Sequence, residues 1–201
     1  MIRNILCDIG NVLLAFDLPP AIARLNHRRD LRAAEAEAIL IHHRDLMEAN
    51  RIAPDDFLRV ILREFAFPGT IDEARGIYAD IFTPILPLWD VVRGLHAGGY
   101  RLVLFSNISP IHVDFITNRY EIFALFDEAV YSFRTGHIKP DDGMYIEAVE
   151  KLGLVPEETL YIDDNAANIE TGKRFGFHTH CYDLHHHEAL LATLGQLRIG
   201  E

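Results

Sequence analysis

The stretch Ile5-Leu6-Cys7-Asp8-Ile9-Gly10-Asn11 determines how the rest of the chain is interpreted. An apolar run ends abruptly at the carboxylate of Asp8, and a glycine follows two positions later. This pattern predicts a short buried strand with Asp8 at its carboxyl end. Ligands of open α/β sheets bind outside the carboxyl ends of the strands. Asp8 is therefore the first candidate for a functional residue.

Four further apolar runs alternate with helical patterns in the second half of the chain. Strands are predicted at residues 101–105, 129–132, 159–162 and 178–182, and helices at 87–98, 110–120, 141–152, 166–175 and 188–197. Strands that alternate with helices are typical of a parallel sheet covered on both faces. The predicted fold class is α/β, with a doubly wound, Rossmann-like parallel sheet.

Residues 16–85 interrupt this pattern with a different composition. Residues 31–40 consist mostly of strong helix formers. Pro54, followed by two aspartates, is typical of a helix start. A further helix is expected at residues 71–82. We therefore expect a small helical cap domain at residues 16–85, inserted into a core domain formed by residues 1–15 and 86–201.

The 201-residue chain has the composition of an ordinary globular protein, with 49% hydrophobic and 24% charged residues. A net charge of −11 argues against nucleic acid or an anionic membrane as its partner. No apolar run reaches the roughly 18 residues of a membrane span, and the first strand leaves no room for a signal peptide. We therefore expect a cytoplasmic location. Cys7 and Cys181 lie in strand-like runs and are expected in the core, without a disulfide.

Polar side chains follow four predicted strands, at points that a parallel sheet brings together. Each residue alone is typical of a turn, a helix cap or a solvated loop, so the inference depends on their order. Clustered carboxylates repel one another unless a cation neutralises them, and oxygen ligands suit Mg²⁺. A carboxylate can also attack a phosphoryl group, whose charge a lysine, a hydroxyl and backbone N–H groups can balance. The residues concerned are Asp8, Ser106, Asn107, Lys139, Asp163 and Asp164.

These residues resemble the motifs of the haloacid dehalogenase-like (HAD) hydrolase superfamily, and the helical insertion lies where that family places its cap. The four stretches that are similar to the family's motifs are residues 8–12, residues 104–107, Lys139-Pro140 with Asp141 and Tyr145, and residues 162–165. The resemblance implies that Asp8 is the nucleophile. It further implies that Ser106 and Lys139 bind the phosphoryl group and hold the nucleophile in place.

The resemblance also implies roles for the remaining candidates. Asn107 would bind phosphate through its backbone N–H, and Gly10 and Asn11 would lie against the same group. The expected Mg²⁺ ligands are Asp8, the carbonyl of Gly10, and Asp164, with Asp163 either beside the ion or one layer behind.

Gly10 departs from the family pattern. Most phosphatases of the family have a second aspartate two residues after the nucleophile, which acts as general acid and base. Three interpretations follow: the substrate has an easier leaving group, such as a sugar 1-phosphate; a water or a cap residue acts instead; or the chain binds phosphorylated ligands without turnover. Subgroups that this chain resembles, the glucose-1-phosphate phosphatases and the N-terminal domains of epoxide hydrolases, include members with glycine here.

The favoured hypothesis is a Mg²⁺-dependent phosphatase acting on a small phosphate ester, with sugar phosphates among the candidates, through an aspartyl-phosphate. Haloacid dehalogenases also lack the second aspartate and attack carbon without a metal, but serines typically replace their acidic pair. The retained Asp163-Asp164 pair therefore favours the phosphatase over a metal-independent 2-haloacid dehalogenase. A non-catalytic domain that binds phosphate ligands is the remaining alternative. The oligomeric state is left open.

Several other polar residues are ambiguous from the sequence. Arg134 and His137 flank the Lys139 loop, where they would add positive charge. Cap residues that face either the cleft or solvent are His42, His43, Glu48, Asn50 and Arg51.

Overall fold

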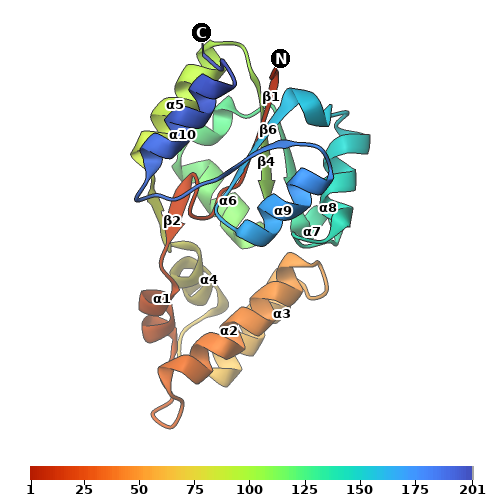
Figure 1. Cartoon of the computed structure of the whole chain (residues 1–201). Coiled ribbons are helices and arrows are strands. Elements are labelled where there is room, and N and C mark those ends of the chain that lie inside the picture. Colours follow the sequence, from red (N-terminus) through yellow and green to blue (C-terminus); the bar gives the residue numbers. More distant parts are fainter. Residues whose placement is uncertain (201) are drawn as a thin grey trace.

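The computed structural model describes residues 1–200, in which a parallel sheet with its helices stands above a group of four helices (Figure 1). Five strands form the sheet in the order β5-β4-β1-β6-β7, and all neighbours are parallel. Their bounds are β1 (Asn4–Cys7), β4 (Arg101–Ser106), β5 (Glu128–Tyr131), β6 (Thr159–Asp163) and β7 (His178–Cys181). The predicted α/β class is confirmed.

Helices cover both faces of this sheet, so its central strands are apolar without alternation. Ile5 and Cys7 of β1 face one apolar cluster, and Leu6 faces another. The first cluster contains side chains of α5 (Leu86–Ala97), α6 (Pro110–Arg119) and α10 (His187–Gln196), and the second contains those of α8 (Asp142–Ile146) and α9 (Ala166–Arg174). The short elements are η1 (Glu121–Leu125), α7 (Ser132–Thr135), the π-helical η2 (Glu147–Lys151) and η3 (Pro156–Glu158). The doubly wound arrangement is thus confirmed.

Strand β1 lies at the point where the strand order reverses. The chain passes from β1 to β4 and β5 on one side, and then to β6 and β7 on the other. Cys7 pairs with Leu104 of β4 and with Ile162 of β6, so the next residue, Asp8, is level with Phe105 and Asp163. Reversal points of this kind are where open α/β sheets bind ligands.

The four inserted helices pack around a separate apolar cluster, to which Ile111 of α6 also belongs. They are α1 (Leu18–Leu25), α2 (Ala33–Glu48), α3 (Pro54–Glu64) and α4 (Ile71–Ala79). Leu40, Phe57 and Phe65 are fully buried in this cluster. The segment is helical as predicted, and the two domain boundaries stay predictions. Among residues 1–200, no helix combines the length and the apolar character that crossing a membrane requires.

A two-stranded ribbon joins the inserted helices to the sheet, and the sequence analysis missed it. Strand β2 (Leu14–Phe16) pairs antiparallel with β3 (Phe82–Pro84), with Phe16 opposite Phe82. The helix expected to reach residue 82 therefore ends at Ala79. A strand of three residues is too short to show the alternation of apolar and polar residues that identifies strands in a sequence. The pairing also depends on a partner almost seventy residues away.

The two cysteines differ in their surroundings. Both are free thiols, as expected, and Cys7 is buried in the central strand. Cys181 is exposed, so its predicted place in the core is wrong. The reason is that β7 is the last strand of the sheet, and only part of it is covered.

The packing of α9 on β6 yields a stability prediction. A Cβ atom at Gly172 would lie 2.6 Å from Cδ1 of Tyr161. That ring cannot easily move, because its hydroxyl donates a hydrogen bond to Asp163. Gly172→Ala is therefore expected to lower the free energy of unfolding by about 1–3 kcal/mol in urea denaturation.

Gly94→Ala is the matched control, since Gly94 is also in a helix interior and an added Cβ there meets no described atom within 4 Å. We expect this variant to be unchanged or more stable by about 0.5–1 kcal/mol. Equal effects of the two substitutions would contradict the close helix–strand contact at Gly172.

Candidate active site

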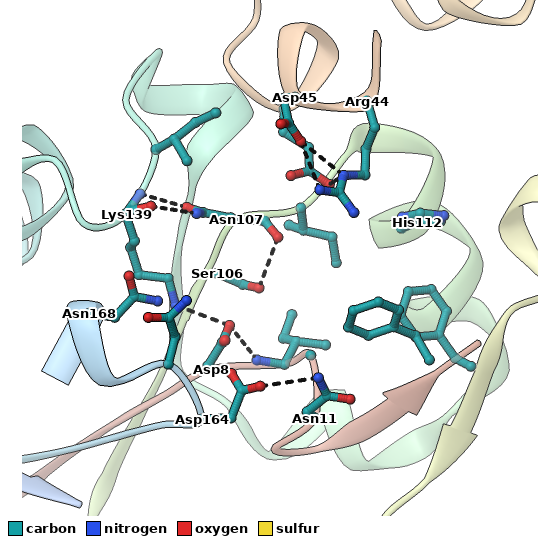
Figure 2. Close-up of a pocket in the computed structure, with 18 of the residues that line it drawn as sticks. Asp8, Asn11, Arg44, Asp45, Ser106, Asn107, His112, Lys139, Asp164 and Asn168 are labelled. Carbon is teal, nitrogen blue, oxygen red and sulfur yellow. Dashed lines mark hydrogen bonds and ion pairs between the residues drawn. The ribbon is translucent and has the colours of Figure 1, made fainter. Parts of the chain in front are cut away.

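A cleft of about 390 Å³ lies between the carboxyl end of the sheet and the inserted helices (Figure 2). Residues that follow β1, β4 and β6 form one wall. Helix α2 and the β2–β3 ribbon contribute to the other, through Arg44, Asp45, Glu48, Phe16 and Phe82. The predicted candidates that line the cleft are Asp8, Gly10, Asn11, Ser106, Asn107, Lys139 and Asp164.

Asp8 has one oxygen that is held in place and one that is open. Its Oδ1 accepts a hydrogen bond from the backbone N–H of Ile9 at 2.7 Å and lies 3.1 Å from Nζ of Lys139. No backbone N–H and no ammonium of residues 1–200 contacts its Oδ2, and the nearby Ser106 hydroxyl lowers the pKa of the carboxyl as a hydrogen-bond donor. Burial raises the pKa of the Asp8 carboxyl, and the Lys139 ammonium opposes that shift. The strand end thus presents a fixed carboxylate with a free oxygen at the cleft.

The Lys139 ammonium is buried between two carboxylates. Nζ donates to Oδ2 of Asp163 at 2.6 Å and to the carbonyl of Phe105 at 2.7 Å, and its third contact is Asp8. Burial lowers the pKa of Lys139, but Asp8 and Asp163 outweigh that effect and leave the pKa raised. The lysine therefore stays charged at any physiological pH.

Asn107 holds the loop that carries Lys139. Its side-chain amide donates to the carbonyl of Lys139 at 3.0 Å and accepts from the N–H of Lys139 at 2.8 Å. This pair of hydrogen bonds fixes the lysine backbone against the end of β4. The sequence analysis expected a contribution only from the backbone of Asn107.

Asp163 is fully buried and uses both of its oxygens on protein donors. A carboxylate has about four acceptor positions, and four hydrogen bonds occupy those of Asp163. The donors are Nζ of Lys139 at 2.6 Å, the Tyr161 hydroxyl at 2.5 Å, the Asn165 N–H at 2.8 Å and Nδ2 of Asn168 at 3.0 Å. Asp163 therefore holds the Lys139 ammonium in place, and its position relative to a bound cation stays a prediction.

Asn11 orients Asp164 at the cleft. Its side-chain amide donates to Oδ2 of Asp164 at 3.1 Å, and its own N–H donates to the carbonyl of Leu14. Asn11 adopts a left-handed conformation, with φ of 52°. Because that backbone N–H is already used, the predicted phosphate contact of Asn11 has no donor there.

The carboxylate cluster suits a divalent cation. One ligand atom from each of Asp8, Asp163 and Asp164 lies within 4.8 Å of the others. Burial and the neighbouring Asp163 raise the pKa of Asp164. With Lys139 as the only ammonium among the cluster contacts described in residues 1–200, the cluster retains excess negative charge when ionised. Hard oxygen donors with excess negative charge are what Mg²⁺ requires.

The family assignment follows from sequence comparison. The haloacid dehalogenase-like hydrolase family matches residues 2–176. The chain belongs to this family. It is 25% identical over 189 residues to the D-ribitol-5-phosphate phosphatase of Bacteroides thetaiotaomicron, a match that covers 89% of this chain and 91% of that protein. A (S)-2-haloacid dehalogenase of Pseudomonas putida is 30% identical over 109 residues, covering 53% of this chain and 48% of the dehalogenase.

Solved structures agree with this assignment. A predicted HAD-like family hydrolase from Porphyromonas gingivalis has a TM-score of 0.79 and 28% identity, with 98% of both chains covered. A HAD family enzyme from Bacteroides thetaiotaomicron, in complex with magnesium and inorganic phosphate, has a TM-score of 0.79 and 21% identity over 92% of this chain and 96% of that one. The predicted family and the predicted enzyme class, a hydrolase, are confirmed.

Ser106 and Gly10 of this HAD-like hydrolase also line the cleft. The Ser106 hydroxyl is buried at the end of β4, and its hydrogen bond to the carbonyl of Asn107 is long, at 3.5 Å. Gly10 lies beside the ring of Phe16, and a Cβ atom there would be 3.3 Å from that ring. The place of the family's second aspartate is therefore bounded by an aromatic side chain in this chain.

Several residues that line the cleft were not predicted from the sequence. Glu48 was among the predicted cap candidates, but Arg44 and Asp45, which precede it on α2, were not. Residues four positions apart share one helix face, and this spacing was the available signal. His112 of α6 and Asn168 of α9 also line the cleft. His42, Arg51 and His137 line a smaller cavity beside it, of about 280 Å³.

The buried position of Asp163 yields a prediction. Asp163→Ala removes one of the two carboxylates that hold the Lys139 ammonium, and truncating one partner of a buried ion pair costs about 3–5 kcal/mol. We expect that loss in the free energy of unfolding, measured by urea denaturation. Glu170→Ala removes a carboxylate from an exposed pair with Lys173 and should change stability by less than about 1 kcal/mol. A loss of similar size in both variants would argue against a structural role for Asp163.

Proposed function

We propose that this HAD-like hydrolase is a Mg²⁺-dependent phosphatase that acts on a small phosphorylated metabolite through an aspartyl-phosphate on Asp8. The observation that carries the proposal is the buried Asp8 carboxylate, fixed at one oxygen and open at the other, beside Lys139 and a carboxylate cluster. The similarity to a D-ribitol-5-phosphate phosphatase over most of the chain supports the same chemistry.

The proposed reaction has two displacements at phosphorus. The open oxygen of Asp8 attacks, and the alcohol leaves. Water then attacks the phosphorus of the aspartyl-phosphate and releases orthophosphate and the Asp8 carboxylate. Lys139 balances the charge of the nucleophile and of the phosphoryl oxygens, and the Ser106 hydroxyl and the backbone N–H of Asn107 donate hydrogen bonds to them. Positioning and charge neutralisation of this kind provide most of the catalysis in phosphoryl transfer.

Mg²⁺ would be held by Asp8, Asp164 and the carbonyl of Gly10, where it supplies positive charge next to the transferred phosphoryl group. Asn11 orients Asp164 for this role through its amide. Asp163 acts on Lys139 rather than on the ion, because its oxygens are already occupied.

The proposed substrate class is sugar or polyol phosphates. A cleft of about 390 Å³ suits a small metabolite. Beyond the carboxylate cluster its lining includes Arg44, Asp45, Glu48 and Asn168, whose donors and acceptors can bind hydroxyl groups. The named substrate of the Bacteroides relative, a polyol phosphate, is of this class.

Two other functions compete with the phosphatase. The dehalogenase relative favours attack of Asp8 on carbon, but the chain spans only about half of that protein. Displacement of halide needs no metal. In a dehalogenase the acidic pair at 163–164 would therefore add negative charge that no cation balances, which favours the phosphatase. The alternative of a domain that binds phosphate esters without turnover predicts affinity with no release of phosphate.

The nucleophile is tested with Asp8→Asn. The amide keeps a side-chain oxygen that can accept from Ile9 but is a far weaker nucleophile, so release of phosphate from p-nitrophenyl phosphate and from a panel of sugar phosphates should fall to background. Circular dichroism should report an unchanged fold. Full activity in Asp8→Asn would refute the assignment, and tight binding without turnover in the unsubstituted chain would support the non-catalytic alternative.

Metal removal tests the cofactor. EDTA should abolish phosphate release, and added Mg²⁺ should restore it. Mg²⁺ alone should also raise the melting temperature of the unsubstituted chain, since a ligand that binds only the folded state stabilises it. Asp164→Asn should lose that increase. Metal-independent release of halide from 2-haloacids would favour the dehalogenase instead.

A further inference from the structure

We propose that Glu48 of the inserted helix α2 is the general acid and base of the reaction, in place of the aspartate that Gly10 replaces. The inference rests on the proposed phosphatase function and assigns to Glu48 the proton transfers at the leaving oxygen and at the attacking water. Glu48 would thus perform the proton transfers of the aspartate that is absent at position 10, from the opposite wall of the cleft.

Glu48 is in the right place to do this. It is the last residue of α2 and lines the same cleft as Asp8. Arg44 and Asp45, on the same end of that helix, lie across the cleft from Asp8 and Asp164 (Figure 2). An ester bound with its phosphorus at Asp8 has its leaving alcohol directed away from the sheet, towards α2, because the nucleophile and the leaving group lie on opposite sides of phosphorus.

The Glu48 side chain is largely buried, and no hydrogen bond engages its carboxylate. The residue is 8% exposed, and its nearest ion-pair partner, Nε of Arg44, is 3.9 Å away, which is too long for a hydrogen bond. Arg44 donates instead to Asp45, at 2.8 and 3.1 Å. No donor among residues 1–200 reaches Glu48. The carboxylate oxygens of Glu48 are not among the unpaired polar atoms that residues 1–200 shut off from solvent, so they are open to the cleft that the residue lines. A ligand in the cleft can therefore exchange a proton with this group.

The pKa of Glu48 fits the role. Burial raises it to about 7, Arg44 opposes the shift, and Asp45 and Asp8 add to it. A general acid works best when its pKa is near the working pH, because both protonation states are then accessible.

Asp45 and His112 line the same cleft but are less suited than Glu48 to act as the general acid and base. The Asp45 side chain is 52% exposed and is bound by Arg44. Burial lowers the pKa of His112 to about 4, and its Nε2 lies 3.0 Å from the carbonyl of Tyr78. His112 is therefore neutral at physiological pH and is engaged by the backbone.

Glu48 gives up a proton in the first step of the reaction and regains one in the second. When an Asp8 oxygen attacks phosphorus, the ester P–O bond breaks and its electron pair passes to the leaving oxygen, which takes the proton of Glu48. The Glu48 carboxylate then takes a proton from water while the water oxygen attacks the aspartyl-phosphate and the bond from phosphorus to Asp8 breaks. Orthophosphate leaves, and both side chains return to their starting states.

The test separates leaving groups that need a proton from those that do not. The substrates are p-nitrophenyl phosphate, whose phenolate leaves without help, and the most rapidly hydrolysed member of a polyol phosphate panel that includes D-ribitol 5-phosphate. Rapid-quench measurements record alcohol release in the first turnover, before the aspartyl-phosphate is hydrolysed. In Glu48→Gln, release of the polyol should slow by roughly 10²–10⁴-fold, while release of p-nitrophenol stays within about tenfold.

A second readout follows from the base role. In Glu48→Gln the aspartyl-phosphate should accumulate, so p-nitrophenol should appear in a burst of about one equivalent per active site. Glu48→Ala should behave in the same way, which excludes an effect of how the glutamine packs. Glu37→Gln removes a carboxylate from the same helix outside the cleft lining and should match the unsubstituted chain.

The inference is overturned if Glu48→Gln slows first-turnover release of both leaving groups equally, or if it changes only KM, because Glu48 would then act in packing or binding. These outcomes leave the proposed phosphatase intact. Absence of Mg²⁺-dependent turnover of every ester in the unsubstituted chain would overturn both.

Discussion

The ammonium of Lys139 is the interaction on which the site depends. It lies between the carboxylates of Asp8 and Asp163, over the rings of Phe105 and Tyr161 at 5.1 and 5.8 Å from their centroids. Burying such charges is costly unless each is paired and hydrogen-bonded. Here every donor of the lysine and every acceptor of Asp163 is used, so the arrangement has few alternatives. The carboxylate at the end of β1 is thereby fixed before any substrate arrives.

That constraint explains why separate parts of the chain must fold together. The lysine comes from the loop after β5, its partners come from β1 and β6, and Asn107 at the end of β4 holds its backbone. The parallel sheet supplies the geometry, since its register places Asp8 level with Asp163. The inserted helices take no part in this arrangement and contribute only the opposite wall, with Arg44, Asp45 and Glu48. The nucleophile and its charge balance therefore come from the sheet, whereas the proton transfers proposed for Glu48 and the choice of substrate come from the inserted helices.

Much of the fold and of the sheet side of the site was predictable, because strand ends of a parallel sheet meet by construction. The pattern of apolar runs identified all five parallel strands, and the polar residues after them identified Asp8, Ser106, Lys139 and Asp164. The division of labour between Asp163 and Asp164 was not predictable, because it depends on which carboxylate meets Tyr161 and Asn168 in space. The cleft side of α2 was equally hidden, since its polar residues have the composition of a solvated helix face. The β2–β3 ribbon was missed because each strand is short and its partner is distant.

The β2–β3 ribbon also brings the two connections of the inserted helices together beside the site. Both connections to the sheet run side by side and are hydrogen-bonded to each other. The inserted helices also contact α6, through Ile111 in their apolar cluster and through His112 at the carbonyl of Tyr78. Phe16, which belongs to the ribbon, lies against Gly10 two positions after Asp8, so a substitution in the ribbon would also change the surroundings of the nucleophile.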